Sequence, residues 1–220
     1  GLQPIADSVE GMRVGVIKDD GFFRPSPAIR RAVREAADFL ESRGAEVERF
    51  EVPEAEKMFR MYVGAMSADG GFQARYAVRK SRLHGPFRKL IMATRIPAWM
   101  RSTVAGLLNL LGQKYQATLV RAGRKLSASH YWLLIHAMNR YRRKFAKQFE
   151  QQGLDVLLSP AFALPAMCHD DGIDLLPAGS HAMLQNLVGG PGGMVPWSRV
   201  LEGEETDRQA NRDGAIRRAI

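Results

Sequence analysis

The sequence has no aspartate or glutamate between Gly70 and Phe149, although the 220-residue chain contains 23 acidic residues elsewhere. The same stretch holds 17 of the 32 lysines and arginines, so the positive charge of the chain, a net +9, is concentrated in its middle third. Such an asymmetry favours an anionic partner surface. The alternative is a basic face that is only solvated and binds no partner.

Further absences limit the cellular setting of the chain. Its single cysteine, Cys168, excludes an internal disulfide and favours a reducing compartment, so we expect a cytoplasmic location. No apolar run reaches the roughly 18 residues of a membrane-spanning helix, and no signal peptide opens the sequence. Peripheral association is therefore the membrane contact that we consider. The sequence starts at Gly1 rather than Met, and we expect both of its ends to be cuts.

The sequence also lacks the usual patterns of catalytic and metal sites. It has no G-x-S-x-G elbow, and the stretch KDDGFF after the first predicted strand is not a glycine-rich phosphate loop. Cys168, His169, Asp170 and Asp171 crowd one loop, but no second pair of ligands stands at a metal-binding spacing. From the residues alone we therefore predict no catalytic residue, no metal and no cofactor within this chain.

Residues 12–52 predict a strand, a helix and a second strand with short connections. Ser26 can cap the helix, Pro27 suits its first position, and Gly44 suits its left-handed end. Such a unit favours parallel strands and a right-handed crossover. We therefore predict an α/β fold with a mixed central sheet and helices on both of its faces.

The rest of the chain predicts helices around one more buried strand. Helices are expected at 54–79 with a break at 67–71, from Pro97 to Tyr115, at 129–152, and from a cap at Ser180. Strands are expected at 156–158 and 194–200. In the helix 129–152, the phase is marked by Trp132, Ile135, Met138 or Asn139, Arg142, Phe145 and Phe149. We expect one partial domain over 1–200, a helical insertion at about 85–128, called the cap below, and a polar tail at 201–220.

The expected helix after Pro97 is amphipathic. A helical wheel gathers large apolar side chains on one half, and Arg101, Ser102 and Asn109 on the other. We predict membrane contact for Trp99, Met100, Val104, Leu107, Leu108, Leu111 and Tyr115. An aromatic residue brackets each end of this stripe and basic residues flank it, which suits a helix lying on an anionic lipid surface.

Two alternatives to a membrane remain for this helix. A buried core face or a homodimer face would show much the same apolar stripe. Nucleic acid is disfavoured, because no recognisable binding motif occurs and the aromatics do not alternate with the basic residues as a stacking platform. Charge alone would support only weak, salt-sensitive binding to nucleic acid.

Five blocks of the sequence resemble, in the same order, the C-terminal part of amidase-signature enzymes, in particular the fatty acid amide hydrolase branch. They begin with the RVG strand, the PSPA helix start and GAEV, followed by VGAMSADGG. The third block is RKLIMATRIPAWMRSTVAGLLNLLGQKY, the fourth YRRKFAKQFEQQGLDVLLSPAFALPA, and the last AGSHAMLQNLVGGPGGMVPWSRV. The resemblance covers the chain from about Met12 to Val200.

This resemblance implies part of a serine hydrolase that cleaves carboxylic amides, with fatty acid amides as the expected substrates. The family uses a Ser-Ser-Lys triad, which lies before the matched segment, so we expect the 220-residue chain alone to be inactive. The resemblance implies no cofactor, a lipid-like amide as substrate, and a membrane-binding role for the cap. The alternative is a non-catalytic basic module that binds a membrane or another partner.

The resemblance also implies residues that line the substrate pocket. They are Met66, Ser67, Leu90, Ile91, Ser180, Met183, Leu184 and Asn186. The alternative for the apolar members of this set is ordinary packing in the core.

Overall fold

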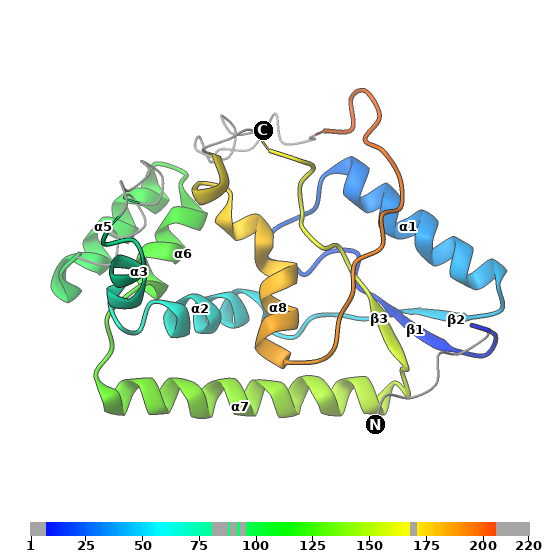
Figure 1. Cartoon of the computed structure of the whole chain (residues 1–220), viewed down its shortest axis with the longest axis horizontal. Helices are drawn as coiled ribbons and strands as arrows, with labels where there is room; N and C mark the ends of the chain where they lie inside the picture. The colour runs from blue at the N-terminus through cyan, green and yellow to red at the C-terminus, as the bar shows by residue number, and fades with distance from the viewer. Residues whose placement is uncertain (1–7, 81–87, 89–91, 93–95, 168–170, 206–220) are drawn as a thin grey trace.

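The computed structural model describes residues 8–80, 88, 92, 96–167 and 171–205, and its elements are labelled in Figure 1. The strands are β1 (Arg13–Val16), β2 (Glu46–Arg49) and β3 (Val156–Leu158). The larger helices are α1 (Pro27–Ser42), α2 (Ala55–Met66), α3 (Phe72–Ala77), α5 (Ala98–Leu110), α6 (Lys114–Ala122), α7 (Ala128–Gln151) and α8 (Ser180–Val188). Two 3-10 helices, η1 (Asp171–Ile173) and η2 (Leu176–Gly179), precede α8.

The three described strands form a parallel sheet in the order β2-β1-β3. Val14 of the central strand pairs with Val47 on one side and with Val156 on the other. The next position is glycine, and a Cβ on Gly15 would lie 2.6 Å from the side chain of Leu154, so a larger residue there would require that side chain to move. The predicted α/β fold is confirmed, and all the strand pairs in the described residues are parallel.

Helix α1 covers one face of the sheet. Val14 and Val16 pack there in a cluster with Val33 and Ala37 of α1. The helix begins as predicted, because the Ser26 hydroxyl accepts a hydrogen bond from the backbone N–H of Ile29 at 3.5 Å.

Helices α2, α7 and α8 cover the opposite face of the sheet (Figure 1). The core there joins Phe50 after β2 to Phe59 of α2, Phe145 of α7 and Leu184 of α8. The Phe50 and Phe145 rings lie 5.2 Å apart. The prediction of helices on both faces is therefore confirmed.

Helices α3, α5 and α6 lie beyond α2, at the end of the molecule away from the sheet (Figure 1). In the chain all three fall between β2 and β3; α5 and α6 lie within the range 85–128 of the expected insertion, and α3 lies before it. The expected single helix from Pro97 to Tyr115 is two helices. Gly112 has a positive φ of 77° and turns the chain between α5 and α6.

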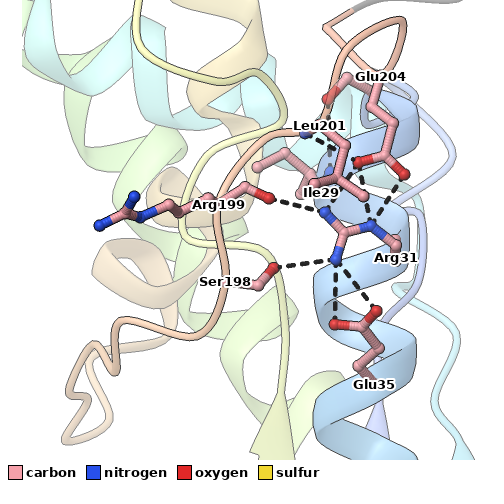
Figure 2. Close-up of polar contacts among 8 residues, drawn as sticks. Ile29, Arg31, Glu35, Ser198, Arg199, Leu201 and Glu204 are labelled. Atoms are coloured by element: carbon pink, nitrogen blue, oxygen red, sulfur yellow. Dashed lines mark hydrogen bonds and ion pairs between the residues drawn. The ribbon is translucent and has the colours of Figure 1, made fainter.

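The strand expected at 194–200 does not form, so that prediction is wrong. This segment makes no sheet ladder, and it is held instead by a side chain of α1, as Figure 2 shows. The Arg31 guanidinium donates to the carbonyl of Arg199 at 2.7 Å and pairs with Glu204 at 2.8 Å and with Glu35 at 3.0 Å. Its contacts with both carboxylates raise the pKa of Arg31.

Candidate functional site

The α5–α6 pair is the part of the cap that the structure describes. Ala105 of α5 packs on Ala117 and Val120 of α6, and all three are buried. The small side chains of Ala105 and Ala117 allow the two helices to approach closely. Val104 and Leu108 of α5 pack around them. The contact face of α5 is therefore centred on Ala105.

Arg101 holds the two helices together, although the sequence pattern had assigned it to the solvent side of α5. Its side chain is buried, and its guanidinium donates to the carbonyls of Val120, at 2.8 Å, and Gly123. These carbonyls end α6, where helical C=O groups lack partners and carry partial negative charge. Burial and the nearby Arg124 lower the pKa of Arg101.

The opposite face of α5 exposes a row of apolar side chains. Trp99 is 79% exposed, Leu107 59%, Leu110 86% and Leu111 64%. Large apolar side chains at this exposure in one helix mark an interaction surface rather than a core. We call these four residues the α5 apolar face.

The other residues predicted to contact a membrane do not all lie on that face. Met100 is exposed, whereas Val104 and Leu108 are half-buried and pack on the α5–α6 contact. The prediction for Tyr115 is wrong in this structure. Tyr115 is buried on α6 beside Phe23, and its hydroxyl donates to the carbonyl of Phe22 at 3.2 Å. The turn at Gly112 moves Tyr115 off the face of α5.

The residues implied for the substrate pocket are dispersed. Met183 and Leu184 of α8 are buried together in the core, whereas Met66, at the end of α2, is 70% exposed. Ser67 donates to the carbonyl of Val63 at 2.7 Å. Asn186 is exposed and donates to the hydroxyl of Tyr62 at 3.4 Å. Leu90 and Ile91 lie outside the described residues.

Ser180 is not the cap of α8 that the sequence predicted. It is the first helical residue, after Gly179, and it is fully buried with no hydrogen-bond partner for its hydroxyl oxygen among the described residues. The next residue, His181, is also buried, and its Nε2 lies 3.9 Å from Oδ2 of Asp20. A buried polar cluster of Asp20, Ser180 and His181 thus sits at the beginning of α8.

Asp20 connects this cluster to the carboxyl end of β1. Its Oδ1 accepts hydrogen bonds from the backbone N–H groups of Phe22 at 2.9 Å and Phe23 at 3.0 Å. Ligands of open α/β sheets bind at the carboxyl ends of strands, so an acidic residue after β1 was a signal available in the sequence. His181 carried no such signal, because only the docking of α8 brings it to Asp20.

The buried histidine predicts a pH dependence of stability. Burial lowers the pKa of His181, and Asp20 opposes this shift only in part. In the unfolded chain the pKa of a histidine is about 6.5. Just below that pH, the unfolded chain therefore binds more protons than the folded chain. We expect the free energy of unfolding to fall as pH drops through about 6.5, and to fall less in His181→Gln. Urea unfolding at a series of pH values measures this difference, and parallel curves for both proteins would contradict it.

The described residues contain no cluster of three or more histidine, cysteine, aspartate or glutamate side chains suited to a metal ion. Cys168, His169 and Asp170 lie outside the described residues. In the same described part of the chain, every helix is too short or too polar to traverse a bilayer.

Known amide hydrolases are similar to this chain in sequence and in fold. Fatty acid amide hydrolase 1 of Caenorhabditis elegans is 28% identical over 207 residues, which are 92% of this chain and 35% of that protein. Fatty-acid amide hydrolase 1 of Sus scrofa is 28% identical over 201 residues, 90% of this chain and 34% of that protein. A solved structure of a fatty acid amide hydrolase covers 84% of this chain and 28% of its own, with a TM-score of 0.59 at 19% identity.

This chain spans about a third of the length of the curated relatives that it matches. The likeness to the solved hydrolase structure supports the fold described above. The amidase family pattern matches residues 2–205, which is nearly the whole chain. The chain therefore belongs to the amidase family.

Proposed function

We propose that this chain is part of an amide hydrolase that cleaves lipid-like carboxylic amides. The match of residues 2–205 to the amidase family carries the proposal. The relatives named fatty acid amide hydrolase support a fatty acyl group in the substrate. In the proposed reaction a serine oxygen attacks the amide carbon, and the amine leaves with a proton delivered through a Ser-Lys relay. Water then hydrolyses the acyl ester and regenerates the serine.

We assign the Ser-Ser-Lys triad to sequence outside these 220 residues, since no residue here matches the corresponding motif. We therefore expect the purified 220-residue chain to show no labelling by a fluorophosphonate serine probe. A longer product of the same reading frame should be labelled and should hydrolyse a long-chain fatty acid amide. Labelling of the short chain that disappears on substitution of one of its own serines would overturn the assignment.

The proposal also gives the α5 apolar face a role in docking the enzyme on a lipid bilayer, which is where a lipid-like amide is dissolved. The exposure of Trp99, Leu107 and Leu110 supports this role. So does the absence of acidic residues from the sequence between Gly70 and Phe149, because an acid there would be repelled by anionic headgroups.

The docking role predicts a large loss of lipid binding when the α5 apolar face becomes acidic. We expect Leu107→Asp with Leu110→Asp to weaken partition into phospholipid vesicles by about 100-fold, because each buried leucine contributes about 1.5–3 kcal/mol. Vesicle co-sedimentation measures the partition. The control is Met194→Asp with Val195→Asp, which adds the same charge at side chains 78% and 76% exposed, between α8 and Glu204. Equal losses in the two variants would remove the docking role.

A non-catalytic basic module is the second candidate function. The 17 basic residues between Gly70 and Phe149 favour it, because a charged surface needs no catalytic residue to bind an anionic partner. The reading frame before Gly1 discriminates the two candidates. A lysine followed by a glycine- and serine-rich segment is expected for the hydrolase, whereas a start codon close to Gly1 would favour the module.

A further inference from the structure

Helix α7 runs along one edge of the molecule and turns a long face away from the core (Figure 1). Its buried residues, Met138, Tyr141 and Phe145, lie on one side. At 3.6 residues per turn, an arc of about 80° centred opposite this buried side holds Ser129, five further residues and, at its C-terminal end, the exposed Glu150. We call these five residues the α7 stripe; they are Trp132, His136, Arg140, Arg143 and Lys147, all of which are exposed.

The positive charges of the α7 stripe are not neutralised by the described residues. Within those residues, Arg140, Arg143 and Lys147 have no hydrogen-bond or ion-pair partner. The neighbouring Lys144, by contrast, pairs with Glu54 at 2.8 Å. Three unpaired cations along one face of a helix attract an anionic surface, and this attraction is strongest over distances within the Debye length of about 10 Å.

An apolar end completes the α7 stripe. Trp132 is 61% exposed and the adjacent Leu133 is 64% exposed. Tryptophan is enriched at the boundary between lipid headgroups and acyl chains, where its ring is buried and its N–H stays hydrated. The helix has 24 residues and is about 36 Å long, so its stripe can lie along a flat surface.

We propose that the α7 stripe is a second membrane-contact surface, specific for anionic phospholipid, on which α7 lies parallel to the bilayer. This inference rests on the membrane part of the proposed function and adds to it a lipid requirement. The α5 apolar face contributes burial of hydrocarbon, which does not depend on lipid charge. The α7 stripe contributes attraction to phosphate and carboxylate headgroups, with Trp132 inserted at one end. A nucleic-acid surface is disfavoured, because a single aromatic at the end of the stripe cannot stack successive bases.

The test compares vesicles of phosphatidylcholine alone with vesicles that also contain phosphatidylserine. We expect Arg140→Gln with Arg143→Gln to weaken binding of the full 220-residue chain to the anionic vesicles by about 30-fold. Binding to the neutral vesicles should be unchanged. The matched control is Arg34→Gln with Arg43→Gln, which removes two exposed arginines, one on α1 and one directly after it, across the sheet from α7. An equal loss in the control would mean that net charge alone attracts the chain, and it would overturn the proposal.

A second measurement locates Trp132 directly. In a chain with Trp99→Phe and Trp197→Phe, the remaining tryptophan reports the environment of the α7 stripe. Its emission should shift to shorter wavelength on anionic vesicles. Bound protein with unshifted emission would overturn the proposal. So would an Arg140→Gln, Arg143→Gln chain that keeps vesicle binding but loses binding to a single-stranded oligonucleotide.

The same vesicle assay separates this inference from the proposed function. Loss of binding in the α5 variant with no change in the α7 variant would overturn the α7 stripe alone. Loss in the α7 variant with no change in the α5 variant would overturn docking by α5, while amide hydrolysis by the longer protein is judged by its own assay.

Discussion

Arg101→Met is expected to lower the free energy of unfolding by about 2–4 kcal/mol. The substitution removes the donors to the carbonyls of Val120 and Gly123. These carbonyl groups at the end of α6 are then left buried without that hydrogen bond. The loss should be local, because Arg101 lies between α5 and α6 rather than over the sheet. Hydrogen exchange should therefore accelerate in α5 and α6 first, and chemical denaturation should show the reduced stability.

The control for this prediction is Arg121→Met, which removes the same charge from an exposed position on α6. Its effect should stay within about 0.5 kcal/mol. Arg101→Lys keeps the positive charge but loses the planar fork that can reach two carbonyls, so it should fall between the wild type and Arg101→Met. If Arg101→Met and Arg121→Met behave alike, Arg101 does not hold the two helices together.

Asp20→Ala is expected to destabilise the chain by about 2–5 kcal/mol. The substitution removes the acceptor for the backbone N–H groups of Phe22 and Phe23, and it also removes the carboxylate that lies 3.9 Å from Nε2 of His181. The backbone at Phe22 should then become more mobile. The packing of the Phe22 ring on the Phe59 ring, whose centroids lie 4.5 Å apart, should loosen with it. Urea denaturation followed by near-ultraviolet circular dichroism measures both the stability and the aromatic packing.

Asp19→Ala is the matched control for Asp20→Ala. Asp19 is the preceding residue and is exposed, and its carboxylate accepts from the N–H of Gly21 at 2.8 Å in contact with solvent. Water can replace that acceptor, so the cost should be below about 1 kcal/mol. Asp20→Asn keeps an oxygen acceptor and should retain most of the stability. A cost for Asp20→Asn as large as that for Asp20→Ala would mean that the charge, rather than the acceptor, supports the turn.

The sequence predicted best those features that depend on neighbouring residues. The cap at Ser26 and the chain reversal at Gly44, whose φ is 88°, both follow from residues within one helical turn of the element that they bound. The helix after Pro97 also begins where the proline indicated. The strand expected at 194–200 failed because its apolar pattern was local, whereas a strand also needs a partner edge, and Arg31 holds this segment instead.

The candidate surfaces were predicted in part. A helical wheel found the exposed side chains of α5 but treated α5 and α6 as one rod, so Tyr115 was placed on the wrong face. The exposure of Trp132 was not predicted, because hydropathy describes what a side chain prefers and not which face of the helix meets a partner. The asymmetry of charge could be found from the sequence alone, because it depends only on where the charged residues stand in the chain.

By itself the sequence determined the strand–helix–strand unit, the concentration of positive charge and the resemblance to amidases, because periodicity, caps and composition are local or additive. Only the tertiary structure decided that Arg101 is buried, that Asp20 lies close to His181 and that the α7 stripe is exposed. Each of these depends on which distant backbone or side-chain group lies opposite. That is settled when helices pack on the sheet, because close packing leaves one arrangement in which the buried polar groups and the large apolar side chains can both be accommodated.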